Sequence, residues 1–157
     1  MKKLNWWLIL WVLVAVWFLV NPLRAEQKTL KEIIKEAQER CVYVRTLNGQ
    51  GSGVIIGHNL VLIPFHLFEF QSAIYVDGKE AQIGTVSPAG DMALLKVDVK
   101  NFPRPEFGKV EIADTVFYVG SPTNLQCSVV FGRIVNLDVN HIYSSAIPQP
   151  GFSGSGV

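Results

Sequence analysis

The chain has 157 residues, of which 49% are hydrophobic and 17% are charged, and its formal net charge is +1. One globular unit of ordinary size is therefore expected, whereas a nucleic-acid binder with a dominant basic face or an acidic disordered chain is not. The two cysteines make neither a disulfide-dense scaffold nor a four-ligand zinc site.

The N-terminal segment has the pattern of an export signal. Met1-Lys2-Lys3 precedes the apolar run Trp6–Val20, which ends at Asn21-Pro22. As a helix this run would cover roughly 22 Å, which is less than the hydrocarbon core of a bilayer, about 30 Å. We therefore expect residues 1–25 to form a hydrophobic helix that is either a cleaved signal peptide or an uncleaved signal anchor, and the sequence leaves both open. In either case the two lysines are expected to stay in the cytoplasm, and the rest of the chain, after residue 25, is expected to be exported to the other side of the membrane.

Residues 26–40 are predicted to form a linker helix between the leader and the domain. Residues 29–32 (TLKE) fit a capping box, and the apolar residues that follow recur at helical spacing, which predicts a helix over about 30–39. The next segment begins at Cys41, which is far in sequence from Cys127. That spacing does not reveal whether the two cysteines pair, and buried free thiols are the favoured interpretation.

From residue 41 onward, short β-branched and aromatic runs alternate with Gly, Pro, Asn and Asp, a texture typical of strands and turns. Six strands are predicted within residues 41–100: Cys41–Leu47, Gly53–Ile56, Leu60–Pro64, Ala73–Val76, Ala81–Val86 and Met92–Val97. Their number and spacing predict a closed antiparallel barrel. Residues 101–110 contain Pro103 and Pro105 and are predicted to be a connector.

Residues 111–157 are predicted to form a second, partial barrel. They contain three runs with strand character, Thr115–Gly120, Ser128–Val135 and His141–Ile147, and then the glycine-rich stretch 150–157. Three strands do not close a barrel, so the second barrel is expected to be incomplete. The fold class predicted for the whole chain is all-β.

The glycine-rich stretch holds the candidate nucleophile, Ser153. Glycines two residues before it and one after it permit positive φ angles and the close approach of a substrate. In such a loop the backbone N–H groups of Gly151 and Ser153 can converge on one point and form an oxyanion hole. On the residues alone, a flexible Gly/Ser tail remains an alternative interpretation.

A serine hydroxyl needs a base, and His66 is the candidate because it follows a predicted strand among apolar residues. His58 and His141 are more simply interpreted as solvated turn residues. Asp91 opens an otherwise apolar strand and could accept a hydrogen bond from Nδ1–H of His66, which would leave Nε2 facing Ser153. The alternative is that Asp91 merely caps a turn.

Taken together, four blocks in order carry a resemblance to a known family. They are residues 51–56 (GSGVII), His66, residues 91–98 (DMALLKVD) and residues 150–154 (PGFSG). They resemble the trypsin-like serine peptidases, particularly the HtrA/DegP-type branch, over roughly residues 41–157. The resemblance implies a chymotrypsin-like double β-barrel with its active site in the cleft between the barrels. It also implies that His66 is the general base, Asp91 its orienting carboxylate and Ser153 the nucleophile.

The chain also departs from the family pattern. Phe65 stands where a small residue usually precedes the histidine, Phe152 replaces the usual Asp or Asn, and Ser155 replaces a glycine. The family continues past the nucleophile with strands that complete the second barrel, whereas this sequence ends at Val157, and no PDZ-like domain is expected. The resemblance places Ile147 at the base of the substrate pocket, and because residues 144–150 include no acidic side chain, an apolar preference is expected rather than one for Lys or Arg.

The leading hypothesis is an exported serine endopeptidase, periplasmic or extracellular and either free or membrane-tethered, which hydrolyses polypeptides through an acyl-enzyme. It predicts no metal, no organic cofactor and no nucleic-acid partner, and it makes no prediction of oligomeric state. The alternative is a truncated, catalytically inactive protease-like domain that binds peptides or partners at the cell envelope. A third interpretation, a tethered β-barrel domain with a Ser/Gly tail, requires the four blocks to coincide by chance.

Overall fold

The computed structural model describes residue 11 and residues 28–47, 49–67, 73–122, 127–139, 141–147 and 149–156. Apart from Trp11, the predicted leader, residues 1–25, lies outside the described residues. Within the described ranges, no helix combines the length and the apolar character needed to cross a membrane.

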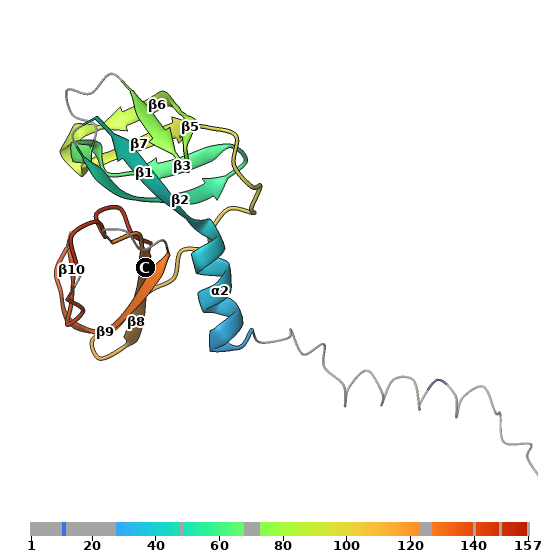
Figure 1. Cartoon of the computed structure of the whole chain (residues 1–157). Coiled ribbons are helices and arrows are strands. Elements are labelled where there is room, and N and C mark those ends of the chain that lie inside the picture. Colours follow the sequence, from blue (N-terminus) through green and yellow to red (C-terminus); the bar gives the residue numbers. More distant parts are fainter. Residues whose placement is uncertain are drawn as a thin grey trace, which may run out of the picture.

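Helix α2, Leu30–Arg40, lies beside both sheets of the molecule (Figure 1). The predicted capping box is present. The Thr29 hydroxyl accepts a hydrogen bond from the N–H of Glu32 at 3.3 Å, and the Glu32 carboxylate accepts one from the N–H of Thr29 at 2.7 Å. At the other end, the buried Arg40 donates to the carbonyl of Pro103 at 2.9 Å. The helix predicted over about 30–39 is therefore confirmed.

The first sheet contains seven antiparallel strands and curls into a barrel-like shape (Figure 1). Its strands are β1 Cys41–Thr46, β2 Gln50–Gly57, β3 Leu60–Ile63, β4 Ile74–Val76, β5 Lys79–Glu80, β6 Gln82–Ser87 and β7 Met92–Lys96. They are arranged in the order β5-β4-β1-β2-β3-β7-β6. All six predicted strands are present.

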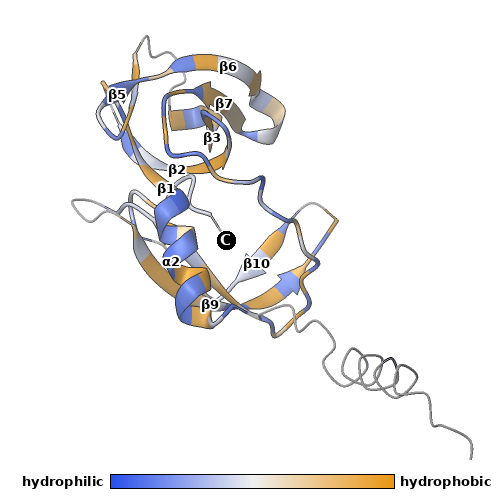
Figure 2. Cartoon of the chain, turned by 90° about the vertical axis from the view of Figure 1, so that its right-hand side faces the viewer, coloured by the Kyte–Doolittle hydropathy of each residue, from blue (hydrophilic) through white to orange (hydrophobic). Residues whose placement is uncertain are grey.

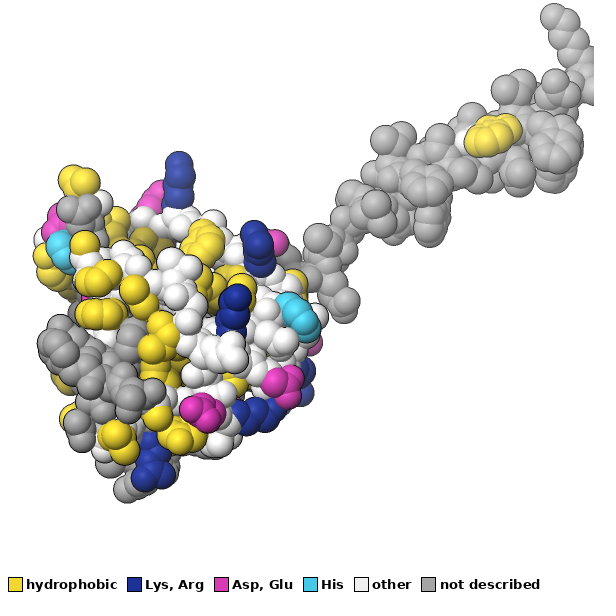
Figure 3. Space-filling model, turned by 90° about the horizontal axis from the view of Figure 1, so that it is seen from above, with side chains coloured by type: hydrophobic (Ala, Val, Ile, Leu, Met, Phe, Trp, Pro, Cys, Tyr) yellow, Lys and Arg dark blue, Asp and Glu magenta, His cyan; other side chains and the backbone are white. Residues whose placement is uncertain are grey.

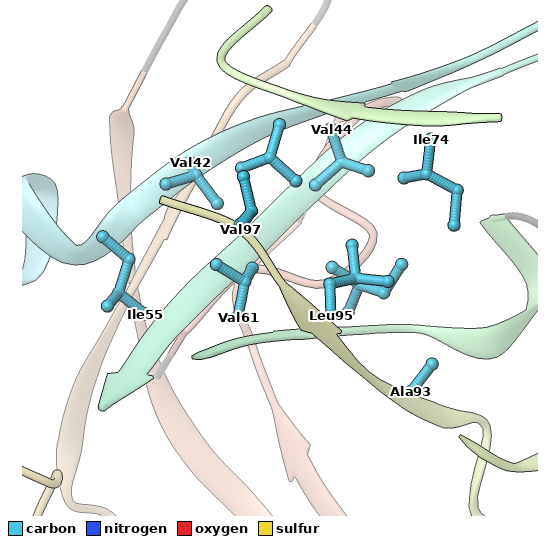
Figure 4. Close-up of a cluster of buried hydrophobic side chains, with 10 residues drawn as sticks. Val42, Val44, Ile55, Val61, Ile74, Ala93, Leu95 and Val97 are labelled. Atoms are coloured by element: carbon cyan, nitrogen blue, oxygen red, sulfur yellow. The ribbon is translucent and has the colours of Figure 1, made fainter. Parts of the chain in front are cut away.

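Alternating apolar residues of this sheet form the core (Figure 4). Val42 and Val44 of β1 are buried, as are Leu95 of β7 and Val61 of β3, while the residues between them are less buried. This period of two is what a curled sheet with one inner face requires. Figure 2 shows hydrophobic stretches along the strands of both sheets and hydrophilic stretches along helix α2.

The second sheet has three antiparallel strands in the order β10-β9-β8. They are β8 Thr115–Gly120, β9 Ser128–Leu137 and β10 Ile142–Ser144, and they correspond to the three predicted runs. No strand lies between β7 and β8, where the connector was predicted. The predicted all-β class is confirmed.

The two largest differences from the predicted strand boundaries, at the start of β2 and at the end of β10, each have a physical reason. β2 starts at Gln50 instead of Gly53, because Gln50 pairs with Arg45 and so extends the ladder with β1. β10 ends at Ser144 instead of Ile147, because its register with β9 shifts after Tyr143.

The two sheets meet at the C-terminal residues 149–156, which we call the serine loop. The N–H of Ser52 in β2 donates to the carbonyl of Ser153 at 2.7 Å, and the N–H of Val119 in β8 donates to the carbonyl of Gly156 at 3.0 Å. The loop is therefore attached to one strand of each sheet (Figure 1). Cys41 and Cys127 are free thiols, as favoured from the sequence, but only Cys41 is buried and Cys127 is partly exposed.

The surface seen from above the first sheet carries charges of both signs in a scattered arrangement (Figure 3). Lys and Arg side chains alternate with Asp and Glu side chains on this face, and hydrophobic side chains gather towards one side. The face in view therefore has no large area of a single charge.

Candidate active site

The pairing of β3 with β7 brings the predicted histidine and aspartate to one end of the first sheet. Ile63 pairs with Ala93, and after β3 the chain forms the single 3₁₀ turn η1, Phe65–Leu67, which carries His66. On the neighbouring strand, Asp91 comes two residues before Ala93. The register of these two strands therefore places His66 and Asp91 at the same end of the strand pair.

Asp91 holds η1 with its backbone and with both carboxylate oxygens. Its carbonyl accepts from the N–H of Phe65 at 3.1 Å, and Oδ1 accepts from the backbone N–H of His66 at 2.9 Å. Oδ2 accepts from Nδ1–H of the His66 ring at 2.7 Å. Asp91 also ends the 3₁₀ turn η2, Pro88–Gly90, with a left-handed φ of 49°. It therefore terminates a turn, as the alternative interpretation had it, and binds His66 as well.

The hydrogen bonds from His66 lower the pKa of this carboxyl group. Partial burial acts to raise the pKa of Asp91, but the donated backbone N–H and ring N–H of His66 outweigh it and hold that pKa below its ordinary value. Asp91 is therefore ionised at neutral pH and acts as a hydrogen-bond acceptor.

Ser153 is presented by a loop whose shape depends on two glycines with positive φ, Gly151 at 98° and Gly154 at 83°. A Cβ atom at Gly154 would lie 2.1 Å from the carbonyl oxygen of Ser52, so a side chain does not fit there. The loop directs the Ser153 hydroxyl at the imidazole, and the distance from Oγ to Nε2 of His66 is 2.6 Å. Residues 149–156 are thus held by specific hydrogen bonds, unlike a flexible tail.

Three predicted side chains form one continuous line of hydrogen bonds. Because the ionised Asp91 accepts from Nδ1–H, the neutral ring of His66 carries its lone pair on Nε2. Nε2 can then accept the hydroxyl proton of Ser153. The arrangement is chemically able to take a proton from a serine hydroxyl and to return it.

The two N–H groups predicted to bind an oxyanion lie in the same loop. Hydrogen bonds join the carbonyls of Gly151, Phe152 and Ser153 to other residues. In contrast, neither the N–H of Gly151 nor that of Ser153 donates a hydrogen bond to another described residue. As far as the described residues go, both are therefore available as donors to a ligand.

A cleft of about 500 Å³ adjoins the three side chains. His66, Asp91 and Ser153 form one part of its wall, and the apolar side chains of Val54 and Leu62 form another. About half of the side-chain surface of His66 and Asp91 is accessible to solvent, 52% and 53%. The hydrogen-bonded line can therefore be reached from outside.

The structure does not bring Ile147 to this cleft. Its side chain is 84% exposed and is absent from the described residues that line the cleft, so its position at the base of a substrate pocket stays a prediction. His141 binds the carboxylate of Asp138 at 3.1 Å, and His58 lies on an exposed turn. Within the described ranges, no three His, Cys, Asp or Glu side chains are grouped as metal ligands.

Sequence reasoning did not single out the side chain of Ser52, although it lies next to the serine loop. It is fully buried in β2, and its hydroxyl donates to the carbonyl of Gly151 at 2.8 Å. The available signal was the serine between two glycines in residues 51–53, a small polar residue directly before the apolar run of residues 54–56.

Comparisons with known proteins agree with this geometry. The family model "Trypsin-like peptidase domain" matches residues 51–157. A probable periplasmic serine endoprotease, DegP-like, from Chlamydia muridarum is 29% identical over 123 residues, which cover 67% of this chain and 25% of that protein.

Solved structures show the same fold. A serine endoprotease from Yersinia pestis matches with a TM-score of 0.71 and 27% identity, covering 82% of this chain and 52% of the other. Rv3671c from M. tuberculosis matches with a TM-score of 0.67, 19% identity and coverage of 78% and 70%. The chain thus spans about a quarter of the Chlamydia protein and about half of the Yersinia chain.

Proposed function

This chain belongs to the trypsin-like peptidase domain family and is similar to DegP-type serine endoproteases, and on that premise we propose that it hydrolyses polypeptides through Ser153, His66 and Asp91. One observation carries the proposal. The Ser153 hydroxyl, the His66 ring and the Asp91 carboxylate are joined by hydrogen bonds of 2.6 and 2.7 Å at the wall of an open cleft.

In the first step, Oγ of Ser153 attacks the carbonyl carbon of the scissile peptide bond, and its proton passes to Nε2 of His66. Asp91 keeps Nδ1–H of the ring in place and stabilises the positive charge that the ring acquires. The carbonyl oxygen becomes an oxyanion, which accepts hydrogen bonds from the N–H groups of Gly151 and Ser153.

The tetrahedral intermediate then collapses and the peptide C–N bond breaks. His66 gives its proton to the leaving amine, and the acyl group stays on Ser153 as an ester. A water molecule attacks this ester while His66 accepts its proton. Release of the carboxylic acid returns the proton to Ser153, so no metal ion or organic cofactor enters any step.

We place this activity outside the cytoplasm. The support is the apolar run Trp6–Val20 after Lys2 and Lys3, together with a relative that is described as periplasmic. Residues 1–25 would serve as a signal peptide or as a membrane anchor. Cell fractionation tests this, since recovery of the intact chain in the cytoplasm would contradict it.

The proposed substrate is a polypeptide with a small or medium apolar side chain before the scissile bond. The apolar wall of the cleft supports this, as does the absence of acidic side chains from residues 144–150, the stretch that includes Ile147. A peptide library would reveal the preference, and preferred cleavage after Lys or Arg would contradict it.

Labelling with a fluorophosphonate probe tests the proposed nucleophile. The probe phosphonylates a serine hydroxyl only when a base and an oxyanion hole assist the attack. We expect the label on Ser153, mapped by peptide mass spectrometry, and we expect it to be lost in both Ser153→Ala and His66→Ala.

The same experiment separates the proposal from its alternative. Circular dichroism must show that each variant is folded, so that lost labelling cannot reflect lost structure. Label on a different serine would refute the assigned nucleophile. A folded wild-type chain that takes no label would favour the inactive, peptide-binding domain instead.

A further inference from the structure

Ser52 forms three hydrogen bonds that join the two sheets to the serine loop. Its N–H donates to the carbonyl of Ser153 at 2.7 Å, and its hydroxyl donates to the carbonyl of Gly151 at 2.8 Å. The same hydroxyl accepts from the N–H of Ser121, at the end of β8, at 2.7 Å. One buried residue of β2 therefore holds two carbonyls of the loop, one on each side of Phe152.

The Gly151–Phe152 peptide lies between the two N–H groups that are proposed to bind the oxyanion. Its carbonyl is held by the Ser52 hydroxyl, and its N–H donates to the carbonyl of Gln149 at 3.1 Å. Since a trans peptide is planar, fixing both ends fixes the rotation of the whole unit. The directions of the Gly151 and Ser153 N–H groups depend on that rotation.

The space around Ser52 matches a hydroxyl-sized group. Ser52 is 0% exposed, and Oγ lies 3.0 Å from where a Cβ atom at Gly120 would stand. A Cβ atom at Gly51 would approach Leu67 to 2.6 Å, so β2 also lies close to η1. The hydroxyl is thus tightly enclosed and has both a donor and an acceptor partner.

We infer that Ser52 is a positioning residue, whose hydroxyl orients the Gly151–Phe152 peptide and so keeps the N–H groups of Gly151 and Ser153 directed at the oxyanion; this inference rests on the proposed function. Ser52 touches none of the proposed reacting groups through its side chain. It acts through the backbone of the serine loop.

Ser52→Ala tests the inference because it deletes the hydroxyl and keeps the N–H bond to Ser153. We expect the rate constant of fluorophosphonate labelling at Ser153 to fall about 10- to 100-fold. This decrease is no larger than the rate decrease caused by removing one oxyanion-hole donor, because both donors are still present in the variant. We expect every folded molecule still to become labelled. The pH dependence of the rate should not change, because the bonds among Ser153, His66 and Asp91 are untouched.

Thr46→Val is the matched control. It also deletes a buried hydroxyl of the first sheet, one that donates to the carbonyl of Gly49 at 3.3 Å, but it lies away from the loop. This variant should lose some stability and be labelled at the wild-type rate. A wild-type rate in folded Ser52→Ala would overturn the inference. So would a smaller labelled fraction at an unchanged rate, because that pattern means partial unfolding.

Two further measurements keep the inference testable in other circumstances. If Ser52→Ala does not fold, Ser52→Cys replaces it, since the thiol is a weaker donor; an intermediate rate supports the inference and a wild-type rate refutes it.

Amide hydrogen exchange does not depend on activity. If the wild type takes no label, the proposed function fails, and faster exchange at Ser121 and Phe152 in Ser52→Ala would still support the positioning role, whereas unchanged exchange would refute it.

Discussion

Asp91 receives two hydrogen bonds from a single residue, one from the backbone N–H of His66 and one from its ring. This double attachment fixes both the turn that carries the histidine and the orientation of its imidazole. The same carboxylate therefore contributes to the stability of η1 and to the proposed chemistry. The ionisation of Asp91 therefore affects both the stability of η1 and the proposed chemistry.

The lowered pKa of Asp91 predicts how stability depends on pH. Burial opposes the shift, yet the bonds from His66 leave the pKa of the folded state below that of the unfolded chain, about 3.9. The stabilisation is therefore complete above that value and is lost as the pH falls through the lower folded pKa. We expect Asp91→Asn to lower the urea midpoint of unfolding at neutral pH. We expect the difference in midpoint between this variant and the wild type, called the gap below, to become smaller below about pH 4.

Urea unfolding followed by circular dichroism over a pH series measures this gap. Asp98→Asn is the control, because Asp98 is an exposed carboxylate whose partner, Lys79, lies 3.0 Å away on the surface. Such a pair contributes little to stability. A gap for Asp91→Asn that stays constant to pH values well below 4, or one no larger than that for Asp98→Asn, would contradict the prediction.

Among the elements, the serine loop is the one whose backbone tolerates least change. Gly154 and Gly78 have nearly the same φ, 83° and 81°, but different surroundings. A Cβ atom at Gly154 would meet the carbonyl of Ser52 at 2.1 Å, whereas one at Gly78 would meet nothing within 4 Å. The two glycines therefore separate backbone strain from lack of space.

Alanine substitution at both positions tests this difference. We expect Gly78→Ala to lower the free energy of unfolding by about 1–2 kcal/mol, the cost of a left-handed alanine, and to leave labelling at Ser153 unchanged. Gly154→Ala adds the steric conflict, so it should lose more stability and should not be labelled. Urea unfolding and fluorophosphonate labelling of both variants provide the measurement. Wild-type labelling of Gly154→Ala would show that the loop can move away from β2.

At this scale the strands could be predicted from the sequence wherever a short run of apolar and β-branched residues lies between turn residues, as in β1, β3 and β7. β5 was not predicted, because its two residues follow the turn Asp77-Gly78 and have no apolar pattern of their own. It forms because the positive φ angles of that turn, 48° and 81°, fold the chain back onto β4. A strand that forms only by pairing across a turn, such as β5, has no periodic pattern of hydrophobic residues in its sequence. A strand with a buried face does have such a pattern.

Across the whole molecule, His66, Asp91 and Ser153 could be selected by residue type and by their order in the chain. What the sequence could not reveal is the packing that positions them. Phe152 is 4% exposed and lies against Gly120, where an added Cβ would come within 2.7 Å of its ring. Its apolar bulk fills the space between β8 and the loop, a contact between distant segments that no local pattern contains. Ser52 had a local signal, the flanking Gly51 and Gly53, but its contacts with Gly151 and Ser121 also join distant segments.

The reactivity of the two thiols can measure how often the two sheets separate, because both thiols lie where α2 and the first sheet contact the second sheet. Cys127 Sγ donates to the carbonyl of Cys41 at 3.5 Å, and the side chain of Gln38 donates to the carbonyl of Cys127 at 2.8 Å. A separate interaction, the hydrogen bond between the two thiol side chains, acts with burial to raise the pKa of Cys41. The same interaction outweighs burial and lowers the pKa of Cys127.

Because the thiolate is the reactive form, iodoacetamide should alkylate the native chain first at Cys127. Cys41 is 7% exposed, and its Sγ lies 3.8 Å from the hydroxyl of Ser121, just after β8, so it should react only when the sheets separate. A time course near neutral pH, analysed by peptide mass spectrometry, measures both rates, and denaturing urea serves as the control in which the two rates should converge. If Cys41 reacts faster than the whole chain unfolds, the sheets open without global unfolding. The serine loop, which is attached to both sheets through Ser52 and Val119, would then be only transiently assembled.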